Sequence, residues 1–350
     1  MKSNYDVLGN HIRLIDTRNK DLVSEQVLGI NIDKFFMPSV ANVIGTDLSK
    51  YKLITKGKFA CNPMHVGRDE RLPVALYTED TPAIVSPAYF MFEVVDSSVL
   101  NEEYLMMWFR RPEFDRLCWL RTDGSVRGGI TWDDICRMEI PVLPMDEQME
   151  IVNSYKAVTE RIALKKQIND NLEETLTAVF AETFSAADAT DHAKLSELMT
   201  FGNGKSRPKT DGSIPVYGGN GVLSYTDQYN IENAILIGRV GAYCGSVYLE
   251  QGICWVSDNA IFAKSKVSSD EFFDYFLLKR LNLFNHHVGT GQQLLTQEIL
   301  NNIEVAKPNI EQIEVFNAKA KAVFQTISAN RNEIIRLQEL SDLLLSRLAG

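Results

Sequence analysis

The sequence predicts a tandem α/β protein: two mixed α+β heads, each followed by one long helix, with the two helices paired as a coiled coil. Three observations predict it. A helix start of the form Pro-x-x-Glu-Gln occurs at Pro144 and again 164 residues later at Pro308. Each start leads into a long run without proline or glycine, and the segments before the two starts match in order. The expected parts are a first head (1–146), a first helix (147–184), a second head (185–310) and a second helix (311–350).

The composition is that of a soluble globular protein. The chain has 350 residues, of which 45% are hydrophobic and 23% charged, enough for two ordinary domains. It has no apolar run of about 18 residues, and its first residues lack the features of a signal peptide, so we expect no membrane span. The five cysteines form no C-x-x-C pair, which favours reduced, mostly buried thiols in a cytoplasmic protein and makes a zinc site unexpected.

The net charge of −10 bears on possible nucleic-acid partners. Basic footprints are the rule for proteins that bind nucleic acid. Neither head and neither helix is basic overall. Any DNA binding must therefore come from local clusters of lysine and arginine, or from a partner that supplies positive surface.

Both long segments carry the 3- and 4-residue apolar steps of a coiled-coil seam. At 1.5 Å per residue each helix would be roughly 57 Å long, so its apolar stripe needs a partner. Mutual pairing is one hypothesis, and two independent helices that each cap a core is the other. The seam positions are Ile151, Tyr155, Val158, Ile162, Leu172, Leu176 and Val179, then Ile313, Phe316, Ala320, Val323, Ile327, Ile334, Leu337, Leu344 and Leu348.

Each seam also carries one asparagine where an apolar residue would fit, at Asn169 and Asn330. If the helices run antiparallel, these two side chains meet and set the register at some cost in stability. The alternative is that each side chain faces water.

The repetition extends into the heads, where four pairs of segments follow one another in the same order. Each head thus contains short strands, glycine-rich loops and an amphipathic helix that ends in two basic residues. The pairs are Lys58–Arg68 with Ala234–Gly245, Ala83–Val94 with Cys254–Ser265, Asn101–Arg111 with Ser269–Arg280, and Gly124–Thr131 with Gly289–Thr296.

The sequence shows no catalytic site. The stretch FGNGKS resembles the end of a phosphate-binding loop, but Met199 stands where the first glycine belongs, and Arg207-Pro208 interrupts the helix that should follow. The histidines lack partners at metal-binding spacing, and no nucleophile motif is present. We therefore expect a non-catalytic protein without cofactor or metal.

With no catalytic motif, binding of a nucleic acid is the function that the loops favour. Both heads carry loops in which arginine, lysine, asparagine, glutamine, serine and tyrosine lie beside glycine. Such side chains hydrogen-bond base edges and phosphates, and glycine lets the backbone approach a ligand closely. Any one loop is also explained as a solvated turn. The candidate DNA-binding residues are Arg68, Arg71, Ser125 and Arg127 in the first head, and Lys205, Arg207, Lys209, Tyr217, Asn220, Arg239, Tyr243 and Gln292 in the second.

Over essentially its whole length the chain resembles the specificity subunit of type I restriction-modification systems. That family has an Ile-Pro-x-x-Pro-x-x-Glu-Gln turn before each conserved helix, and Ile140 to Gln148 fits it well. The second copy, Ile303 to Gln312, keeps Pro308 and Glu311-Gln312 but has Glu304 in place of a proline and is one residue longer. The stretches IPVYGGNGVLSY and GRVGAYCGSVY resemble loops of one type of target recognition domain, and YDVLGNHIRLIDTRN and RGGITWDDICRMEIP resemble those of another.

The resemblance implies that the heads are target recognition domains, each reading one half of a split double-stranded DNA site. It implies that the helices pair antiparallel, set the spacing and dock two methyltransferase subunits, with ATP-dependent restriction subunits in the full complex. The pseudo-twofold repeat suits two half-sites, and because the heads differ, the half-sites should differ. Two other functions remain open: a scaffold with two protein-binding heads, and an enzyme whose site is assembled between the heads.

Overall fold

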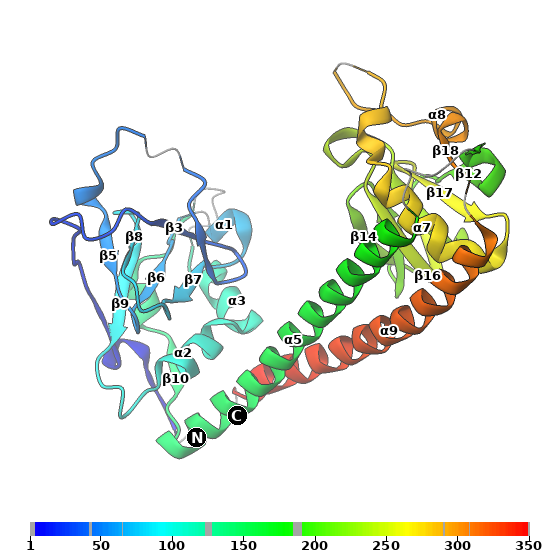
Figure 1. The fold of residues 1–350 in the computed structure, drawn as a ribbon. Helices are drawn as coiled ribbons and strands as arrows, with labels where there is room; N and C mark the ends of the chain where they lie inside the picture. Colours follow the sequence, from blue (N-terminus) through cyan, green and yellow to red (C-terminus); the bar gives the residue numbers. More distant parts are fainter. Residues whose placement is uncertain are drawn as a thin grey trace. The chain divides into compact units, whose positions relative to one another are not determined.

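The computed structural model describes residues 4–41, 44–64, 66–122, 128–184, 191–289, 291–307 and 309–348, with only the backbone described at Arg68 and Ser268. The chain divides into two compact units (Figure 1). Unit 1 comprises residues 1–164 and 333–350, and unit 2 comprises residues 165–332. Each unit thus holds one head and part of each long helix.

The head of unit 1 contains two four-stranded sheets and a short antiparallel pair of strands. The pair is β1 (Tyr5–Val7) with β10 (Glu139–Pro141). One sheet has the order β2 (Ile12–Leu14), β9 (Phe90–Val94), β6 (Phe59–Cys61), β7 (Val74–Leu76), and the other has β4 (Phe36–Pro38), β3 (Val27–Ile30), β8 (Ala83–Val85), β5 (Lys52–Ile54). The helices are α1 (Val66–Asp69), α2 (Glu102–Phe109), α3 (Pro112–Leu120) and α4 (Trp132–Cys136).

The head of unit 2 is built on one six-stranded sheet. Its order is β12 (Met199–Asn203), β17 (Ala260–Ser265), β15 (Ile231–Gly238), β16 (Val247–Val256), β13 (Ile214–Gly218), β14 (Gly221–Thr226), and only the β13–β16 pairing is parallel. A separate antiparallel pair joins β11 (His192–Lys194) to β18 (Glu304–Ala306). The helices are α6 (Leu195–Leu198), α7 (Glu271–Arg280) and α8 (Gln297–Asn302).

The predicted repeat is visible in the elements that flank the sheets. Each head is closed by a two-stranded pair, β1–β10 or β11–β18, just before a long helix begins. The helix before each closing strand begins at a threonine: Thr131 Oγ1 accepts from Asp134 N, and Thr296 Oγ1 accepts from Ile299 N, both at 3.2 Å. The sheets themselves differ, so the heads share the closing strand pair and the helix before it but not the strand topology of their sheets.

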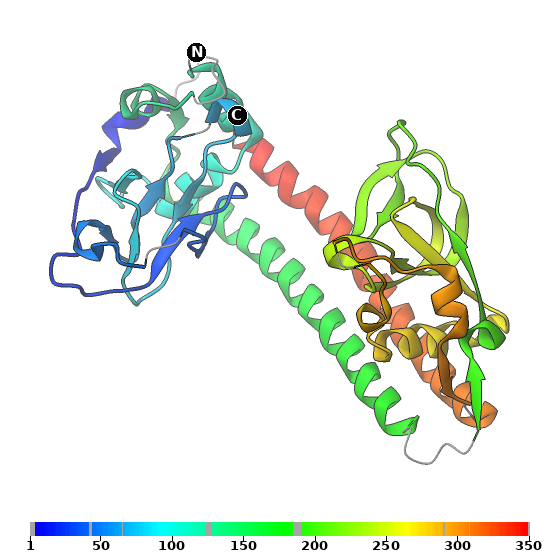
Figure 2. The ribbon, with the colours of Figure 1, turned by 90° about the horizontal axis from the view of Figure 1, so that it is seen from above.

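The helices α2 and α7 lie deep in the two heads. The sequence predicted amphipathic helices here, and that prediction is wrong in detail, because Tyr104–Phe109 of α2 and Phe272–Leu278 of α7 are buried all round. Both faces are covered, since strands of the head lie on one side and the long helices on the other (Figure 2). A helix that is apolar on every side is typical of such a central position.

The long helices α5 (Met145–Thr183) and α9 (Ile310–Arg347) run antiparallel within each unit. In unit 2 the rings of Phe180 and Phe316 are 5.3 Å apart, and Asn330 lies against Asn169 further along. In unit 1 the guanidinium of Arg161 contacts the carboxylate of Glu333 at 2.5 Å. The predicted pairing is confirmed. The same helices also contribute to the cores of the heads, so each of them caps a core as well.

The two seam asparagines meet. Asn330 is 7% exposed, and its Nδ2 donates to Asn169 Oδ1 over 2.8 Å. Lys165 Nζ donates to Asn330 Oδ1, also over 2.8 Å. This arrangement agrees with the register hypothesis and excludes the alternative in which each asparagine only faces water.

The glutamines of the two Pro-x-x-Glu-Gln copies have different structural roles. Gln148 is fully buried: its amide donates to the carbonyls of Val99 and Leu143, and its oxygen accepts from Asn101 N at the start of α2. The counterpart Gln312 is exposed. In unit 2 the side chain of Asn317 takes over this role, accepting from Phe273 N at 2.8 Å.

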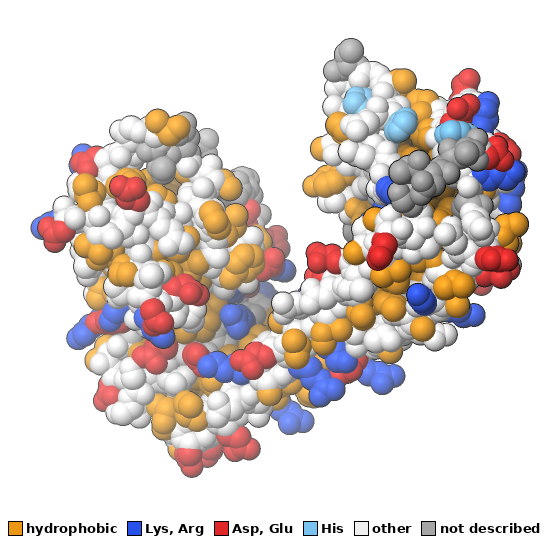
Figure 3. Space-filling model, viewed as in Figure 1, with side chains coloured by type: hydrophobic (Ala, Val, Ile, Leu, Met, Phe, Trp, Pro, Cys, Tyr) orange, Lys and Arg blue, Asp and Glu red, His pale blue; other side chains and the backbone are white. Residues whose placement is uncertain are grey.

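Charges on the surface are mixed rather than segregated. On the face of unit 1 seen in Figure 3, acidic and basic side chains alternate without forming a continuous basic area. This agrees with the expectation that positive charge is available only in local clusters.

Candidate nucleic-acid interface

Four separate loops of unit 2 are joined by hydrogen bonds around the end of β15. The β13–β14 turn, the β15–β16 loop and the β16–β17 turn exchange backbone contacts: Arg239 N donates to the Asn259 carbonyl at 3.0 Å, and Ser257 N donates to the Tyr217 carbonyl at 2.9 Å. Ser246 Oγ donates to the Gly219 carbonyl at 2.5 Å. We call these loops, with the described residues of the 288–295 segment (288, 289 and 291–295), the loop cluster.

The 288–295 segment joins the cluster through the β15–β16 loop. Gly241 N donates to the Gln293 carbonyl at 3.1 Å, and Leu295 N donates to the Arg239 carbonyl at 2.9 Å. These bonds place exposed Gln292 in the same cluster as exposed Tyr243, although the two lie far apart in the sequence. Five of the twelve predicted residues are thereby brought together: Tyr217, Asn220, Arg239, Tyr243 and Gln292.

Glycine at position 238 allows this convergence. A Cβ atom there would lie 2.1 Å from the Tyr243 carbonyl oxygen and 2.8 Å from that of Gly219. The sequence argument assigned glycines beside arginine to close approach of a ligand, and for Gly238 that assignment is wrong, because other loops of the protein occupy the space. Gly241 has a φ of +70° and open space around it, and only its conformation favours glycine.

The basic segment at 205–209 lies beside the same turn. Lys205 N donates to the Val256 carbonyl at 2.9 Å, and the indole Nε1 of Trp255 donates to the Lys205 carbonyl at 3.3 Å. The side chains of Lys205, Arg207 and Lys209 are all exposed. The backbone is thus anchored at the start of the segment while three cations face solvent.

Tyr217 differs from the other candidates. Its side chain is 9% exposed, and its hydroxyl donates to Glu250 Oε2 at 2.9 Å. Burial and the nearby Glu250 carboxylate both raise the pKa of the Tyr217 hydroxyl. Tyr217 therefore packs beneath the surface of the loop cluster. The prediction that it is a DNA-binding residue required an exposed ring, and the ring is buried.

Two polar atoms in the cluster are buried and have no hydrogen-bond partner among the described residues: Arg239 Nε and Ser257 Oγ. A buried donor without an acceptor costs about 1–3 kcal/mol, so such groups usually mark a place where water or a ligand supplies the missing bond. The guanidinium of Arg239 forms no ion pair with any described residue and is partly exposed. The loop cluster thus presents one partly exposed arginine, Arg239, to a hydrogen-bond acceptor on a ligand.

The β16–β17 turn is a part of the loop cluster that was not predicted from the sequence. Asp258 and Asn259 are exposed there, and the Asn259 carbonyl accepts from Arg239 N. The turn has the sequence Val256-Ser257-Asp258-Asn259. Its Asp-Asn pair is a turn signal that could have added the loop to the candidates.

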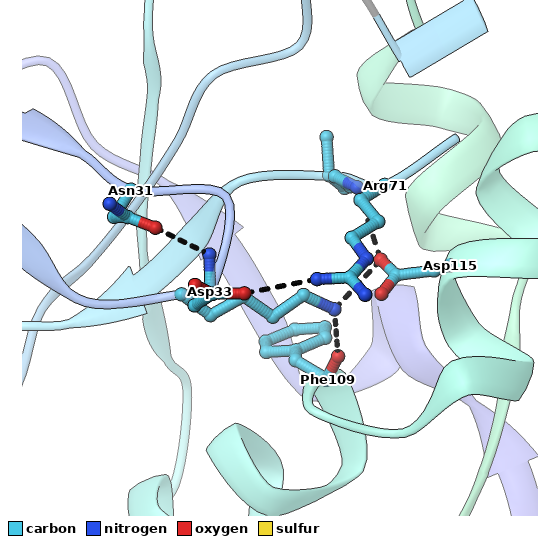
Figure 4. A network of polar contacts seen from close by, with 7 residues as sticks. Asn31, Asp33, Arg71, Phe109 and Asp115 are labelled. Carbon is cyan, nitrogen blue, oxygen red and sulfur yellow. Dashed lines mark hydrogen bonds and ion pairs between the residues drawn. The ribbon is translucent and has the colours of Figure 1, made fainter. Parts of the chain in front are cut away.

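In unit 1 the two predicted loops also come together. Gly67 N donates to the Gly128 carbonyl at 3.0 Å, and Ile130 N donates to the Pro63 carbonyl at 3.1 Å. Ser125 and Arg127 lie outside the described residues, and the side chain of Arg68 is not described. Arg71 is described: its Nη1 contacts Asp33 Oδ1 at 3.0 Å, and its side chain is 52% exposed (Figure 4).

The described residues contain no group of three His, Cys, Asp or Glu placed to hold a metal. Cys61, Cys118, Cys244 and Cys254 are buried free thiols, as the sequence predicted. Burial raises the pKa of the Cys254 thiol to about 12, which keeps it protonated and unreactive at neutral pH. Among the described helices, none is both long and apolar enough to cross a membrane.

Comparison with known proteins places this geometry in a family. Residues 191–340 match the family model of the type I restriction modification DNA specificity domain. Residues 191–340 are thus similar to that domain. This domain includes the whole loop cluster and the basic segment.

One curated protein is similar to part of the chain. The chain is 25% identical over 125 residues to the specificity subunit of the type I restriction enzyme EcoprrI from Escherichia coli, and the match covers 35% of this chain and 31% of that subunit. The match therefore spans about a third of the relative's length.

One solved structure is similar in fold along nearly the whole chain. The S subunit of a type I restriction-modification system from M. genitalium aligns with a TM-score of 0.59 at 17% identity, covering 98% of this chain and 95% of that one. A chain from a study of complex assembly and conformational transition in the type I system aligns with a TM-score of 0.49 at 18% identity, covering 98% and 96%. The first of these shows a likeness in fold over nearly the whole of both chains.

Proposed function

We propose that the protein is the sequence-specific DNA-recognition subunit of a type I restriction-modification complex and performs no catalysis itself. The observation that carries the proposal is Arg239, whose Nε is buried without a partner inside a cluster of loops in a DNA specificity domain. Arginine is the commonest side chain to read guanine in the major groove, through O6 and N7. Because Arg239 is partly exposed, its side chain would be available to an acceptor on DNA.

The surrounding side chains fit the same role. Lys205, Arg207 and Lys209 are exposed cations on a segment fixed at its start, which suits contacts to phosphates that position the protein without reading sequence. Asn220 and Gln292 are exposed amides of the kind that pair with adenine. Tyr217 is left out of the proposed contact set because it is buried.

Each head would read one half of a bipartite double-stranded site, with residues 1–146 and 185–310 as the two target recognition domains. The heads differ in sheet topology and in loop residues, so the two half-sites should differ and the whole site should be asymmetric. The helices at 147–184 and 311–350 would set the separation between the half-sites.

The long helices would also dock two methyltransferase subunits, and ATP-dependent restriction subunits would join the full complex in the cytoplasm. Large apolar side chains remain exposed on α9 in both units, including Val315 at 58% and Ile335 at 58%. Apolar side chains that stay exposed along a helix commonly mark a protein interface. The chemistry of methylation and its cofactor would belong to these partners.

The test is methylome sequencing of a host that expresses this chain with the methyltransferase encoded beside it. We expect a bipartite, asymmetric methylated motif that disappears when this chain is deleted. Exchanging residues 190–305 for those of a related chain should change one half of the motif only. The matched pair R239A and R239K should both weaken methylation, since a lysine cannot replace the arginine fork.

Persistence of methylation after deletion, together with failure of a methyltransferase to co-purify, would overturn the proposal. The scaffold with two protein-binding heads would then become the better explanation.

A further inference from the structure

A tight turn in unit 1 sends two neighbouring side chains in different directions. Asp33 N donates to Asn31 Oδ1 at 2.8 Å, Lys34 N donates to the Asn31 carbonyl at 2.9 Å, and Lys34 has a φ of +68°. The side chain of Asp33 is 66% exposed while that of Lys34 is 4% exposed. Figure 4 shows Asp33 facing Arg71.

The inward side chain fixes the backbone beside Arg71. Lys34 Nζ donates to Asp115 Oδ1 at 2.7 Å and to the Phe109 carbonyl. The same Asp115 oxygen accepts from Leu72 N at 3.0 Å. Desolvation lowers the pKa of Lys34 while the charge of Asp115 opposes this shift. The buried pair therefore holds the residue that follows Arg71 in place.

The outward side chain fixes the guanidinium of Arg71. Arg71 Nη1 donates to Asp33 Oδ1 at 3.0 Å, which uses one of the five N–H donors of the guanidinium. More than half of the Arg71 side chain is exposed, and the pair borders a recess of about 640 Å³ that is also lined by Trp119. The remaining donors can thus meet an external acceptor without breaking the pair.

The charge of this pair discriminates between two acceptors. A phosphate that approached Arg71 would also approach the Asp33 carboxylate, and like charges repel. The edge of a guanine presents neutral acceptors, O6 and N7, and the paired cytosine presents the N4 amino donor, which a carboxylate accepts. A neutral Arg–Asp pair therefore matches a G·C base pair better than it matches the DNA backbone.

We propose that Asp33 is a positioning residue that orients Arg71 to read a guanine in the half-site of the first head. The inference rests on the proposed function and extends it by one residue and one base pair. It assigns a role to a carboxylate that the loop motifs did not include.

The experiment compares variants in the complete complex with its methyltransferase. R71A should reduce discrimination at one G·C position of the first half-site by about 5- to 150-fold, the range typical of one bidentate contact. D33N should relax the same position and leave the second half-site unchanged. D80N is the matched control, because Asp80 forms an exposed ion pair with Lys56 at 2.8 Å in the same head, and we expect it to change nothing.

Salt dependence gives a second readout. A base-reading arginine leaves the slope of log affinity against log salt almost unchanged, whereas loss of one phosphate contact lowers it by about 1. If D33N instead strengthens binding to all sequences and R71A lowers the slope, Arg71 contacts phosphate and the inference is wrong. An unchanged motif in both variants would also overturn it. Absence of any motif in the parent complex would point to failure of the proposed function instead.

Discussion

Replacing Asp274 by asparagine should stabilise unit 2 at neutral and alkaline pH. Asp274 lies on α7 between the sheet and the long helices, is 1% exposed, and its Oδ2 has no hydrogen-bond partner among the described residues. Burial raises the pKa of the carboxyl from 3.8 to about 7; the nearby Ser265 side chain opposes the rise, and the charge of Asp270 adds to it. The folded carboxyl therefore binds its proton more tightly than the unfolded one.

The direction of the pH dependence follows from this difference. At pH values between the pKa of Asp274 in the unfolded chain and its pKa in the folded protein, unfolding releases a proton. The free energy of unfolding therefore falls as pH rises from about 4 to about 7. A shift of about three pKa units at roughly 1.4 kcal/mol each gives a loss of at most about 4 kcal/mol above pH 7. Asparagine fills the same space without titrating, so D274N should remove this loss.

The assay is amide hydrogen exchange of α7, measured by mass spectrometry from pH 5 to pH 8 and corrected for intrinsic exchange rates. We expect the gain in protection of D274N over the parent to grow up to pH 7 and then level off. D211N, which replaces an exposed aspartate of the same unit, is the control and should show no gain. A D274N variant that is less protected than the parent at pH 8, or equally pH-dependent, would refute the reasoning.

Three further predictions concern a buried glutamine in unit 1, a glycine of the loop cluster and a seam asparagine. Q148A should lower the free energy of unfolding of unit 1 by about 2–4 kcal/mol in urea titrations, because it strands buried backbone groups, whereas Q312A at the exposed counterpart should cost almost nothing; equal effects would contradict the assignment. G238A should weaken recognition of the second half-site, measured by methylome sequencing, because a Cβ there meets the Tyr243 carbonyl, while G291A, which has open space, should leave the motif intact. N330A should cost about 1–2 kcal/mol of stability because it leaves the partly buried Asn169 and Lys165 without this partner, and a neutral result in thermal melts would show that these contacts do not stabilise the seam.

Local patterns were sufficient to predict much of the fold. The positions of the two long helices, their pairing and the tandem order of the heads follow from 3- and 4-residue apolar steps and from repeated helix starts, and these signals lie within short windows of sequence. The exposed basic segment at 205–209 was equally predictable, because lysine and arginine beside proline and glycine rarely lie in a core.

The sheet topologies, six strands in one head and two sheets of four in the other, were not predictable, since strand pairing joins residues that are distant in sequence. The burial of Tyr217 depends on Glu250, and the orientation of Arg71 depends on Asp33, which lies 38 residues earlier. Composition and spacing determined which residues could bind DNA. Only the tertiary structure decided which of them face solvent, because that depends on long-range contacts that no local pattern records.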